Sequence, residues 1–210
     1  MFLRKKQLSV LTLGDPRLRV TAQPVETIDD RLQTLIRNLI WTAEKTNGVG
    51  IAAPQVGAAK RLFIVASRPN LRYPHAPKME PTAMINPRVV AHSDEQVAGW
   101  EGCLSVPDQR GQVDRYREIE VEYCDRHGKL HRRVFTDFVA RIFQHELDHL
   151  EGTVFVDRVP DSATLLTDAE YFADLRFTTQ GDLHVVKGDI SSPAGIHRAI
   201  ELRADPFASD

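Results

Sequence analysis

The chain has 210 residues, a length typical of a single domain that can bury a hydrophobic core without disulfide bonds. With 27 Lys and Arg against 29 Asp and Glu, its net charge of −2 gives no global attraction to nucleic acid or to an anionic membrane. Hydrophobic residues make up 42% of the sequence, which argues against disorder, and no apolar run is long enough to span a bilayer. Cys103 and Cys124 are its two cysteines, which excludes a disulfide framework.

The N-terminal segment, MFLRKKQLSVLTLG, lacks the long apolar core and the small-residue cleavage site of a secretory signal. We therefore expect a cytoplasmic protein. An organellar location stays open, because a targeting segment could have preceded this chain.

The first predicted element is a helix from Asp29 to Asn47. Asp29 or Asp30 can cap its start, and Asn47 with Gly48 can end it. The next segment, GVGIAAPQVG at 48–57, is too rich in Gly and Pro for a regular element, so we expect a loop there. The helix has apolar residues at the spacing of one buried face: Leu32, Leu35, Ile36, Leu39, Ile40 and Ala43.

Strands are predicted in the middle of the chain. Residues 61–67, RLFIVAS, form a mostly buried strand, and an exposed loop over 68–81 leads to a strand over 83–92 that bends at Pro87. Residues 125–129 form the turn between two further strands. The first of these has one buried face, because three apolar residues alternate with glutamates: Ile119, Val121 and Tyr123.

A second helix is predicted over 138–150, with Gly152 just past its end. Because strands come in runs and the two main helices stand apart, the pattern favours an α+β fold over a βαβ repeat. We expect a main domain over residues 1–160 and a C-terminal extension over 161–210 that packs on it or trails from it.

Within the extension, Thr167 and Glu170 could form a capping box for a short helix over 168–175. Gln180-Gly181 could turn a small hairpin, and 191–195 has the composition of a loop.

The strongest chemical signal is the segment QHELDH at 144–149. On a helix, His145 and His149 lie one turn apart, so both imidazoles can meet one metal ion. Glu146 is adjacent to the first of them, and its carboxylate could reach a water at the metal without being a ligand. Asp148 could support a ligand or could be solvated, and both readings stay open.

A catalytic metal usually has a third protein ligand. Cys103 is the candidate, because the Gly and Pro residues of EGCLSVP at 101–107 suit a non-regular turn that exposes a thiolate together with backbone N–H groups. Cys124 lies in an alternating strand and is read as structural. In the 48–57 loop, Gln55 supplies an amide and the small residues admit a ligand close to the backbone; a plain tight turn explains that loop equally well.

Three blocks in one order, GVGIAAPQ, EGCLS and QHELDH, resemble the signature motifs of the peptide deformylases, metal hydrolases that remove the formyl group from the N-terminal formyl-methionine of new proteins. The similarity runs from about Leu11 to Asp157. It implies an α+β fold in which antiparallel sheets pack around a central helix that carries the histidine motif.

The resemblance also implies a metal site formed by Cys103, His145 and His149. The implied ion in the cell is Fe(II), and Zn, Ni or Co could occupy the site in the purified protein. Arg141, in ARIFQHE, departs from the apolar residue of many bacterial members and is similar to a subgroup that includes organellar enzymes.

Roles in catalysis follow from the same resemblance. Glu146 would be the general base and acid. Gln55 and the backbone N–H of Leu104 would bind the formyl oxygen, and the backbone of Gly50 would align the peptide. The implied partners are nascent N-formyl-Met peptides near the ribosome exit, with no sequence-specific nucleic acid and no membrane, and we expect a monomer.

Two other functions stay open. A metal hydrolase that acts on another small amide would have the same three blocks, and only substrate profiling distinguishes it from a deformylase. A non-catalytic metal clip would need a fourth protein ligand, and none is evident near the motifs.

Overall fold

The computed structural model describes residues 5–70, 73–173, 175–177 and 183–185. Its helices are α1 (Asp30–Lys45), α2 (Asp137–Leu150) and α3 (Asp168–Ala173), with short 3-10 turns at Pro16–Arg19, Ala53–Val56, Phe155–Asp157 and Ser162–Thr164. Its strands are β1 (Gly50–Ala52), β2 (Leu62–Val65), β3 (Thr82–His92), β4 (Gln96–Cys103), β5 (Val106–Tyr116), β6 (Glu118–Cys124), β7 (Leu130–Thr136), β8 (Leu175–Phe177) and β9 (Leu183–Val185).

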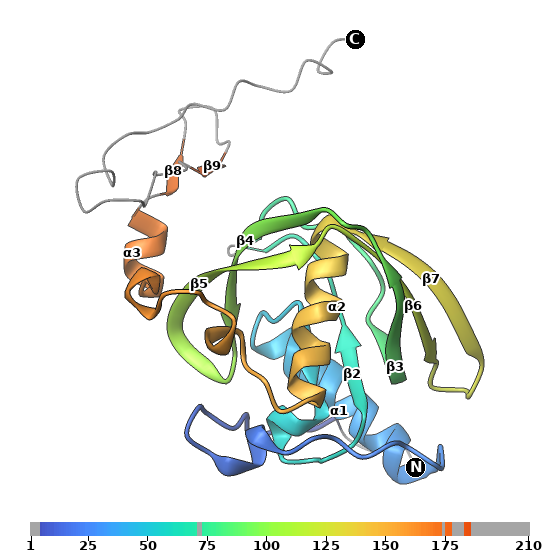
Figure 1. Cartoon of the computed structure of the whole chain (residues 1–210). Coiled ribbons are helices and arrows are strands. Elements are labelled where there is room, and N and C mark those ends of the chain that lie inside the picture. The colour runs from blue at the N-terminus through green and yellow to red at the C-terminus, as the bar shows by residue number, and fades with distance from the viewer. Residues whose placement is uncertain (1–4, 71–72, 174, 178–182, 186–210) are drawn as a thin grey trace.

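The strands form antiparallel sheets around a central helix. Five of them pair in the order β1-β2-β3-β6-β7, and β4 pairs with β5 in a separate hairpin. Helix α2 lies in the middle of the described fold, in contact with β1, β2 and β7 of the large sheet and with β5 of the hairpin (Figure 1). This arrangement is the α+β architecture that the sequence predicted.

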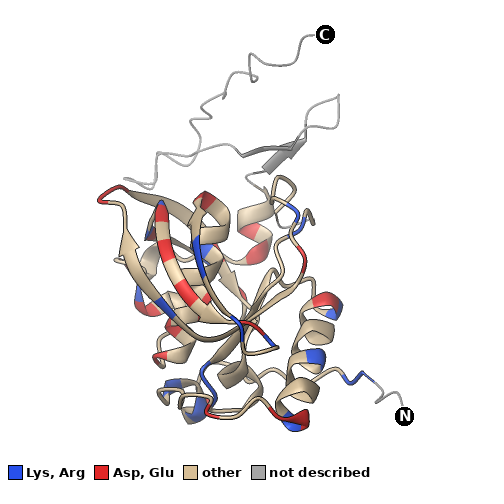
Figure 2. Ribbon diagram, turned by 90° about the vertical axis from the view of Figure 1, so that its right-hand side faces the viewer, with Lys and Arg blue, Asp and Glu red and all other residues tan. Residues whose placement is uncertain are grey.

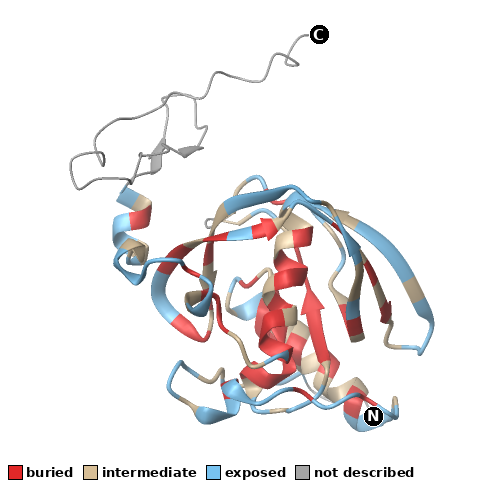
Figure 3. Ribbon diagram, in the orientation of Figure 1, coloured by how far each residue is buried: buried red, intermediate tan, exposed pale blue. Residues whose placement is uncertain are grey.

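Strand β2 is buried on both faces because a helix covers each of them. Phe63 and Val65 pack in the cluster that includes Phe143 of α2, whereas Leu62 and Ile64 pack with the apolar face of α1. Figure 3 shows the buried residues concentrated along α2 and β2. An apolar run without alternation is what a strand between two layers requires.

Helix α1 begins at Asp30, where the side chain of Asp29 accepts a hydrogen bond of 2.8 Å from the backbone N–H of Leu32. The helix ends at Lys45, two residues before the predicted end, and Asn47 has a positive φ of 53°. A short polar residue is one of the few that tolerate this conformation.

The predicted bend at Pro87 is present in β3. The pairing of β3 with β6 shifts between Ile85 and Arg88, because proline has no N–H to donate to the ladder. Asn86 turns its amide toward Val25, donating to the backbone O at 2.9 Å and accepting from the backbone N at 2.8 Å. The bend therefore ties the sheet to the N-terminal segment.

Two segments are more regular than predicted. The expected loop at 48–57 contains β1 and a 3-10 turn, and Cys103 is the last residue of strand β4. The expected turn is present at residues 104–105, where it connects β4 to β5. Strands β1 and β4 escaped prediction because neither has a clear alternation of apolar and polar residues. The register is set instead by pairing with β2 and by the long β4–β5 ladder.

The C-terminal segment packs onto the hairpin. Arg110 of β5 and Leu166 exchange backbone hydrogen bonds of 2.8 and 2.9 Å, and α3 follows at once. The capping box is formed: the Thr167 N–H donates to the Glu170 carboxylate, and the Glu170 N–H donates to the Thr167 hydroxyl. Strands β8 and β9 pair antiparallel, whereas Gln180-Gly181 and 191–195 lie outside the described residues.

Charged residues of both signs are interspersed along the described ribbon (Figure 2). On the outer face of the large sheet, Arg132 pairs with Glu120 at 2.7 Å and Arg88 pairs with Glu122 at 2.5 Å. Among the described helices, none has the length and apolar character needed to cross a membrane.

Candidate active site

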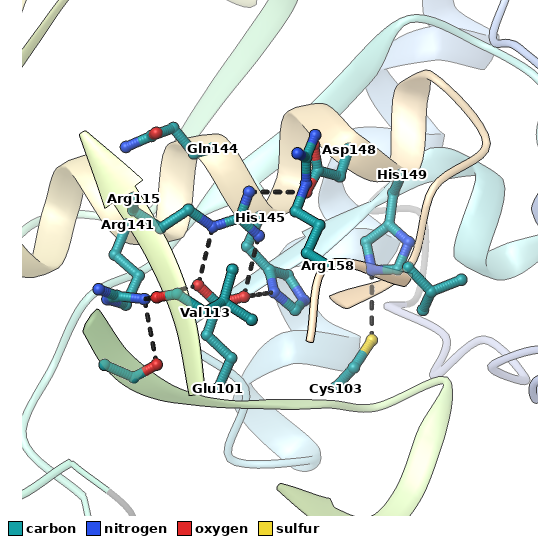
Figure 4. Close-up of polar contacts among 12 residues, drawn as sticks. Glu101, Cys103, Val113, Arg115, Arg141, Gln144, His145, Asp148, His149 and Arg158 are labelled. Carbon is teal, nitrogen blue, oxygen red and sulfur yellow. Dashed lines mark hydrogen bonds and ion pairs between the residues drawn. The ribbon is translucent and has the colours of Figure 1, made fainter. Parts of the chain in front are cut away.

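Helix α2 and strand β4 bring three potential metal ligands together. His145 and His149 lie one turn apart on α2, and Cys103 faces them from the end of β4 (Figure 4). One donor atom from each lies within 4.8 Å of the other two, and Cys103 Sγ is 3.2 Å from His149 Nε2. Cys124, the other cysteine, is not part of this cluster.

The charges of the cluster favour a thiolate at Cys103 paired with a protonated imidazole at His145. Burial opposes ionisation of Cys103, but the charges of His149 and His145 outweigh it and hold the pKa of the thiol well below its usual range. Burial also disfavours charge on His145, yet its contacts with Cys103 and Glu101 raise its pKa well above the usual range. A metal ion would displace the shared proton and bind the thiolate.

Glu101 orients the first histidine, a role that the sequence analysis did not assign. Its carboxylate accepts a hydrogen bond of 2.8 Å from His145 Nδ1, which leaves Nε2 to face the cluster. The same carboxylate, 3% exposed, accepts two bonds of 2.9 Å from Arg115 and one of 2.9 Å from Arg141. Had the strand been recognised, its period of two would have placed Glu101 and Cys103 on one face.

Asp148 belongs to the same network, because Arg115 hydrogen-bonds to both Glu101 and Asp148. It is buried, receives a hydrogen bond of 2.7 Å from Arg115, and is also paired with Arg158 (Figure 4). Of the two readings of Asp148, the solvated one is wrong: its carboxylate supports the arginine that holds Glu101 in place.

Glu146 lies beside the cluster and is almost fully buried. Burial raises its pKa to about 7, which is near the pH at which a base must exchange protons. Among the described residues, its Oε2 and the Nδ1 of His149 are buried atoms without a hydrogen-bond partner. A carboxylate oxygen in this position is available to a small polar molecule next to the three ligand atoms.

Gly50 lies directly against this carboxylate. A Cβ built at position 50 would be 2.3 Å from Glu146 Oε1, so no other residue fits while Glu146 keeps its position. The absence of a side chain here is therefore a requirement of the site and not only of the strand.

Gln55 points its amide into the same region. Its Oε1 accepts a hydrogen bond of 2.8 Å from the Ala52 N–H, which directs Nε2 toward Ser105 Oγ at 3.1 Å and Cys103 Sγ at 3.4 Å. Ser105 is fully buried, and its N–H points at the same sulfur at 3.4 Å. Leu104, between Cys103 and Ser105 in the sequence, lines a cavity beside the cluster.

A cavity opens next to the cluster. Glu146, Gln55 and Leu104 line it together with Cys103 and His145, and Tyr73, Trp100 and Phe138 form an aromatic wall. Arg141 also borders it, where its guanidinium is held by the backbone oxygens of Val97, Gly99 and Val113.

The donor set fits a divalent metal ion. One thiolate and two imidazoles are ligands that Fe(II) and Zn(II) accept, and three protein ligands leave a coordination position open, as catalytic sites do. Two further features suit a catalytic metal site: the Glu101 carboxylate that holds His145, and the Glu146 oxygen that has no hydrogen-bond partner among the described residues.

Comparisons with known proteins agree with this geometry. The family model described as polypeptide deformylase matches residues 7–164. A peptide deformylase 2 of Nostoc sp. is 61% identical over 165 residues, 78% of this chain and 92% of that protein. A crystal structure of a Met-Ala-Ser-bound class I type b peptide deformylase from Acinetobacter baumannii superposes with a TM-score of 0.73 at 46% identity, covering 74% of this chain and all of that one.

Proposed function

Because this chain belongs to the polypeptide deformylase family, we propose that it removes the formyl group from the N-terminal formyl-methionine of new polypeptides in the cavity beside Cys103, His145 and His149. The observation that carries the proposal is the position of Glu146, buried next to three converging ligand atoms with one oxygen unpartnered among the described residues.

Cys103, His145 and His149 would hold one divalent metal ion. When bound, such an ion supplies a Lewis acid that makes water a stronger nucleophile near neutral pH. We propose Fe(II) as the ion in the cell, with Zn, Ni or Co able to take its place in the purified protein, since one thiolate and two imidazoles suit all of them.

Glu146 is the proposed general base and acid. It accepts a proton from the attacking water as the water oxygen bonds to the formyl carbon. When the C–N bond breaks, it returns the proton to the departing amine nitrogen, so that formate and a free N-terminal methionine are the products.

Gln55 and the backbone N–H of Leu104 are the proposed donors to the formyl oxygen, which gains negative charge during attack. The support for Gln55 is its orientation: the Ala52 N–H fixes Oε1, so Nε2 faces the thiolate end of the cavity. The Gly50 backbone is the proposed contact for the peptide, in a strand that borders the same cavity.

The proposed substrates are nascent N-formyl-Met chains, met near the ribosome exit by a monomeric enzyme in the compartment where such chains are made. The Acinetobacter relative binds the tripeptide Met-Ala-Ser, which has the form of a deformylated product. Formyl-Met-Ala-Ser is therefore the substrate of choice for assays.

The test is Glu146→Gln, with Glu26→Gln as a control at an exposed glutamate. We expect Glu146→Gln to retain metal but to release formate from formyl-Met-Ala-Ser more slowly by a factor on the order of 100 to 10,000, because an amide cannot accept the proton. The control should match the parent in both respects.

Metal content by elemental analysis and formate release should be measured on anaerobically purified protein, with acetyl-Met-Ala-Ser as a second substrate. Near-parental turnover of Glu146→Gln would show that Glu146 is not the base. A parent protein that cleaves the acetyl peptide as fast as the formyl peptide would contradict deformylation as its specific activity.

A further inference from the structure

Helix α3 follows the part of the chain that the family model matches, yet it touches the wall of the cavity. The model ends at residue 164, and α3 spans Asp168–Ala173. Tyr171 of α3 is 7% exposed, and its ring packs against Trp100 with centroids 5.4 Å apart. Trp100 lines the cavity, so one of its walls is supported from outside the matched region.

Arg110 makes a second connection between α3 and the cavity. Its guanidinium, 1% exposed, lies 4.9 Å from the Tyr171 ring and 5.6 Å from the Phe172 ring, and it donates to Asp168 at 2.8 Å. A buried cation needs such partners, and α3 supplies three of them.

The other side of Arg110 faces the aromatic wall of the cavity and strand β4, which carries Cys103. Its guanidinium donates to the Tyr73 hydroxyl at 3.3 Å, and the Tyr73 ring also packs at a tilt against Phe138 with centroids 4.9 Å apart. A Cβ at Gly102, the residue before Cys103, would be 3.1 Å from the Arg110 Cζ. Arg110 thus packs between α3, the aromatic wall and the backbone of β4 next to Cys103.

We propose that Tyr171 and Arg110 are positioning residues for peptide binding: α3 holds Trp100 and Tyr73 in place as the aromatic wall against which the substrate docks. This inference rests on the proposed function of the cavity. The ring contacts of Tyr171 reach Trp100 and Arg110 and not Glu146, so Tyr171 affects how tightly the peptide binds and leaves the chemical step unchanged.

The test compares Tyr171→Ala with Tyr171→Phe, which keeps the ring, and with Ala169→Ser, at an exposed position of the same helix. With formyl-Met-Ala-Ser we expect Tyr171→Ala to raise KM roughly three- to tenfold, the change that corresponds to the loss of one aromatic contact. Its kcat and metal content should stay at the parental level. Tyr171→Phe and Ala169→Ser should have the parental KM.

A readout independent of turnover is the fluorescence of Trp100 in a Trp41→Phe background, in which Trp100 is the remaining tryptophan. Titration with the product peptide Met-Ala-Ser should change this emission in the parent, and the midpoint should move to higher peptide concentration in Tyr171→Ala. Tyr171→Leu, which keeps an apolar side chain, should shift the midpoint in the same direction and covers the case in which the alanine variant does not fold.

The outcomes separate the two proposals. If the parent fails to release formate from formyl-Met-Ala-Ser, the proposed function is wrong. If the parent is active and both Tyr171→Ala and Tyr171→Leu keep the parental KM and titration midpoint, the role of α3 is wrong. A fall in kcat together with metal loss at unchanged KM would also overturn it, since α3 would then act on the metal site.

Discussion

Glu146 occupies the space that a side chain at position 50 would take. The 2.3 Å separation between a Cβ at Gly50 and Glu146 Oε1 is far below any real contact, and Glu146 is itself buried. At the scale of single residues, the position of the proposed base is therefore set by an absent side chain on a neighbouring strand.

Gly50→Ala should force the Glu146 carboxylate away from the ligand cluster. Because small displacements of a catalytic group are costly, we expect kcat for formate release to fall about 100-fold while the metal is retained. Gly128→Ala is the matched control: Gly128 has a φ of 83° in the turn between β6 and β7, remote from the site. It should lower the free energy of unfolding by about 1 kcal/mol without changing kcat. An active Gly50→Ala enzyme would mean that Glu146 has room to reposition.

The two cysteines should behave differently. Cys103→Ala removes the thiolate that lies 3.2 Å from His149, and metal content should fall sharply. Cys124→Ala removes a partly buried thiol that packs with the α1 side of the sheet, and metal content and activity should stay unchanged. Elemental analysis of both variants decides the matter, since equal losses would mean that Cys103 is not the sole thiolate ligand.

At the scale of elements, the site depends on how α2 is held against the β4–β5 hairpin. Gln144, beside the first histidine, accepts a hydrogen bond of 3.1 Å from the Tyr116 N–H and donates one of 2.9 Å to the Tyr116 oxygen. Arg115 of β5 donates to Asp148 of α2, and Arg141 of α2 donates to Glu101 of β4, so both arginines bridge the same two elements. The helix that carries two ligands is thus locked to the strand that carries the third.

Gln144→Ala removes both bonds to Tyr116 and leaves backbone groups without these partners. We expect the free energy of unfolding to fall by about 2 kcal/mol, since each hydrogen bond contributes about 1 kcal/mol. Gln96→Ala, at an exposed position of β4, is the control and should be neutral. Urea denaturation of the metal-loaded proteins measures the difference; equal stability of the two variants would show that Gln144 does not hold the helix.

At the scale of the whole molecule, the proposed ligands, base and oxyanion donors all precede residue 160, whereas part of the cavity wall is supported from beyond it. The predicted boundary between 1–160 and 161–210 thus separates the proposed chemistry from a segment that packs on the same hairpin. We expect the two parts to be coupled, because α3 packs on the residues that form the cavity wall.

Truncation tests this division. A chain that ends after Gly181 keeps α3 and should release formate at the parental rate. A chain that ends before Asp161 loses the partners of Arg110, so it should be less stable by a few kcal/mol because a buried charge is left unpaired. It should keep measurable hydrolysis, with a raised KM. Complete loss of activity on cutting after Gly181 would mean that the final residues help to form the site and that the boundary is wrong.

Local patterns determined much of the architecture in advance. Four patterns depend only on residues that are close in sequence, so they can be recognised before the fold is known. They are the one-faced apolar spacing of α1, the uninterrupted apolar run of β2, the alternation of β6 and the i, i+4 histidines of α2. Strand β4 was missed for the opposite reason: its Gly-rich sequence becomes a strand only when β5 pairs with it.

Three ordered motifs and their spacing were enough to predict the class of fold, the family and the candidate ligands. Tertiary structure alone decided how those ligands are supported. Glu101 and His145 are 44 positions apart, Gln55 and Cys103 are 48 apart, and Arg110 and Asp168 are 58 apart. The buried ion pairs and hydrogen bonds between such residues exist only after the chain closes long loops, and no local propensity encodes which distant partner each group will meet.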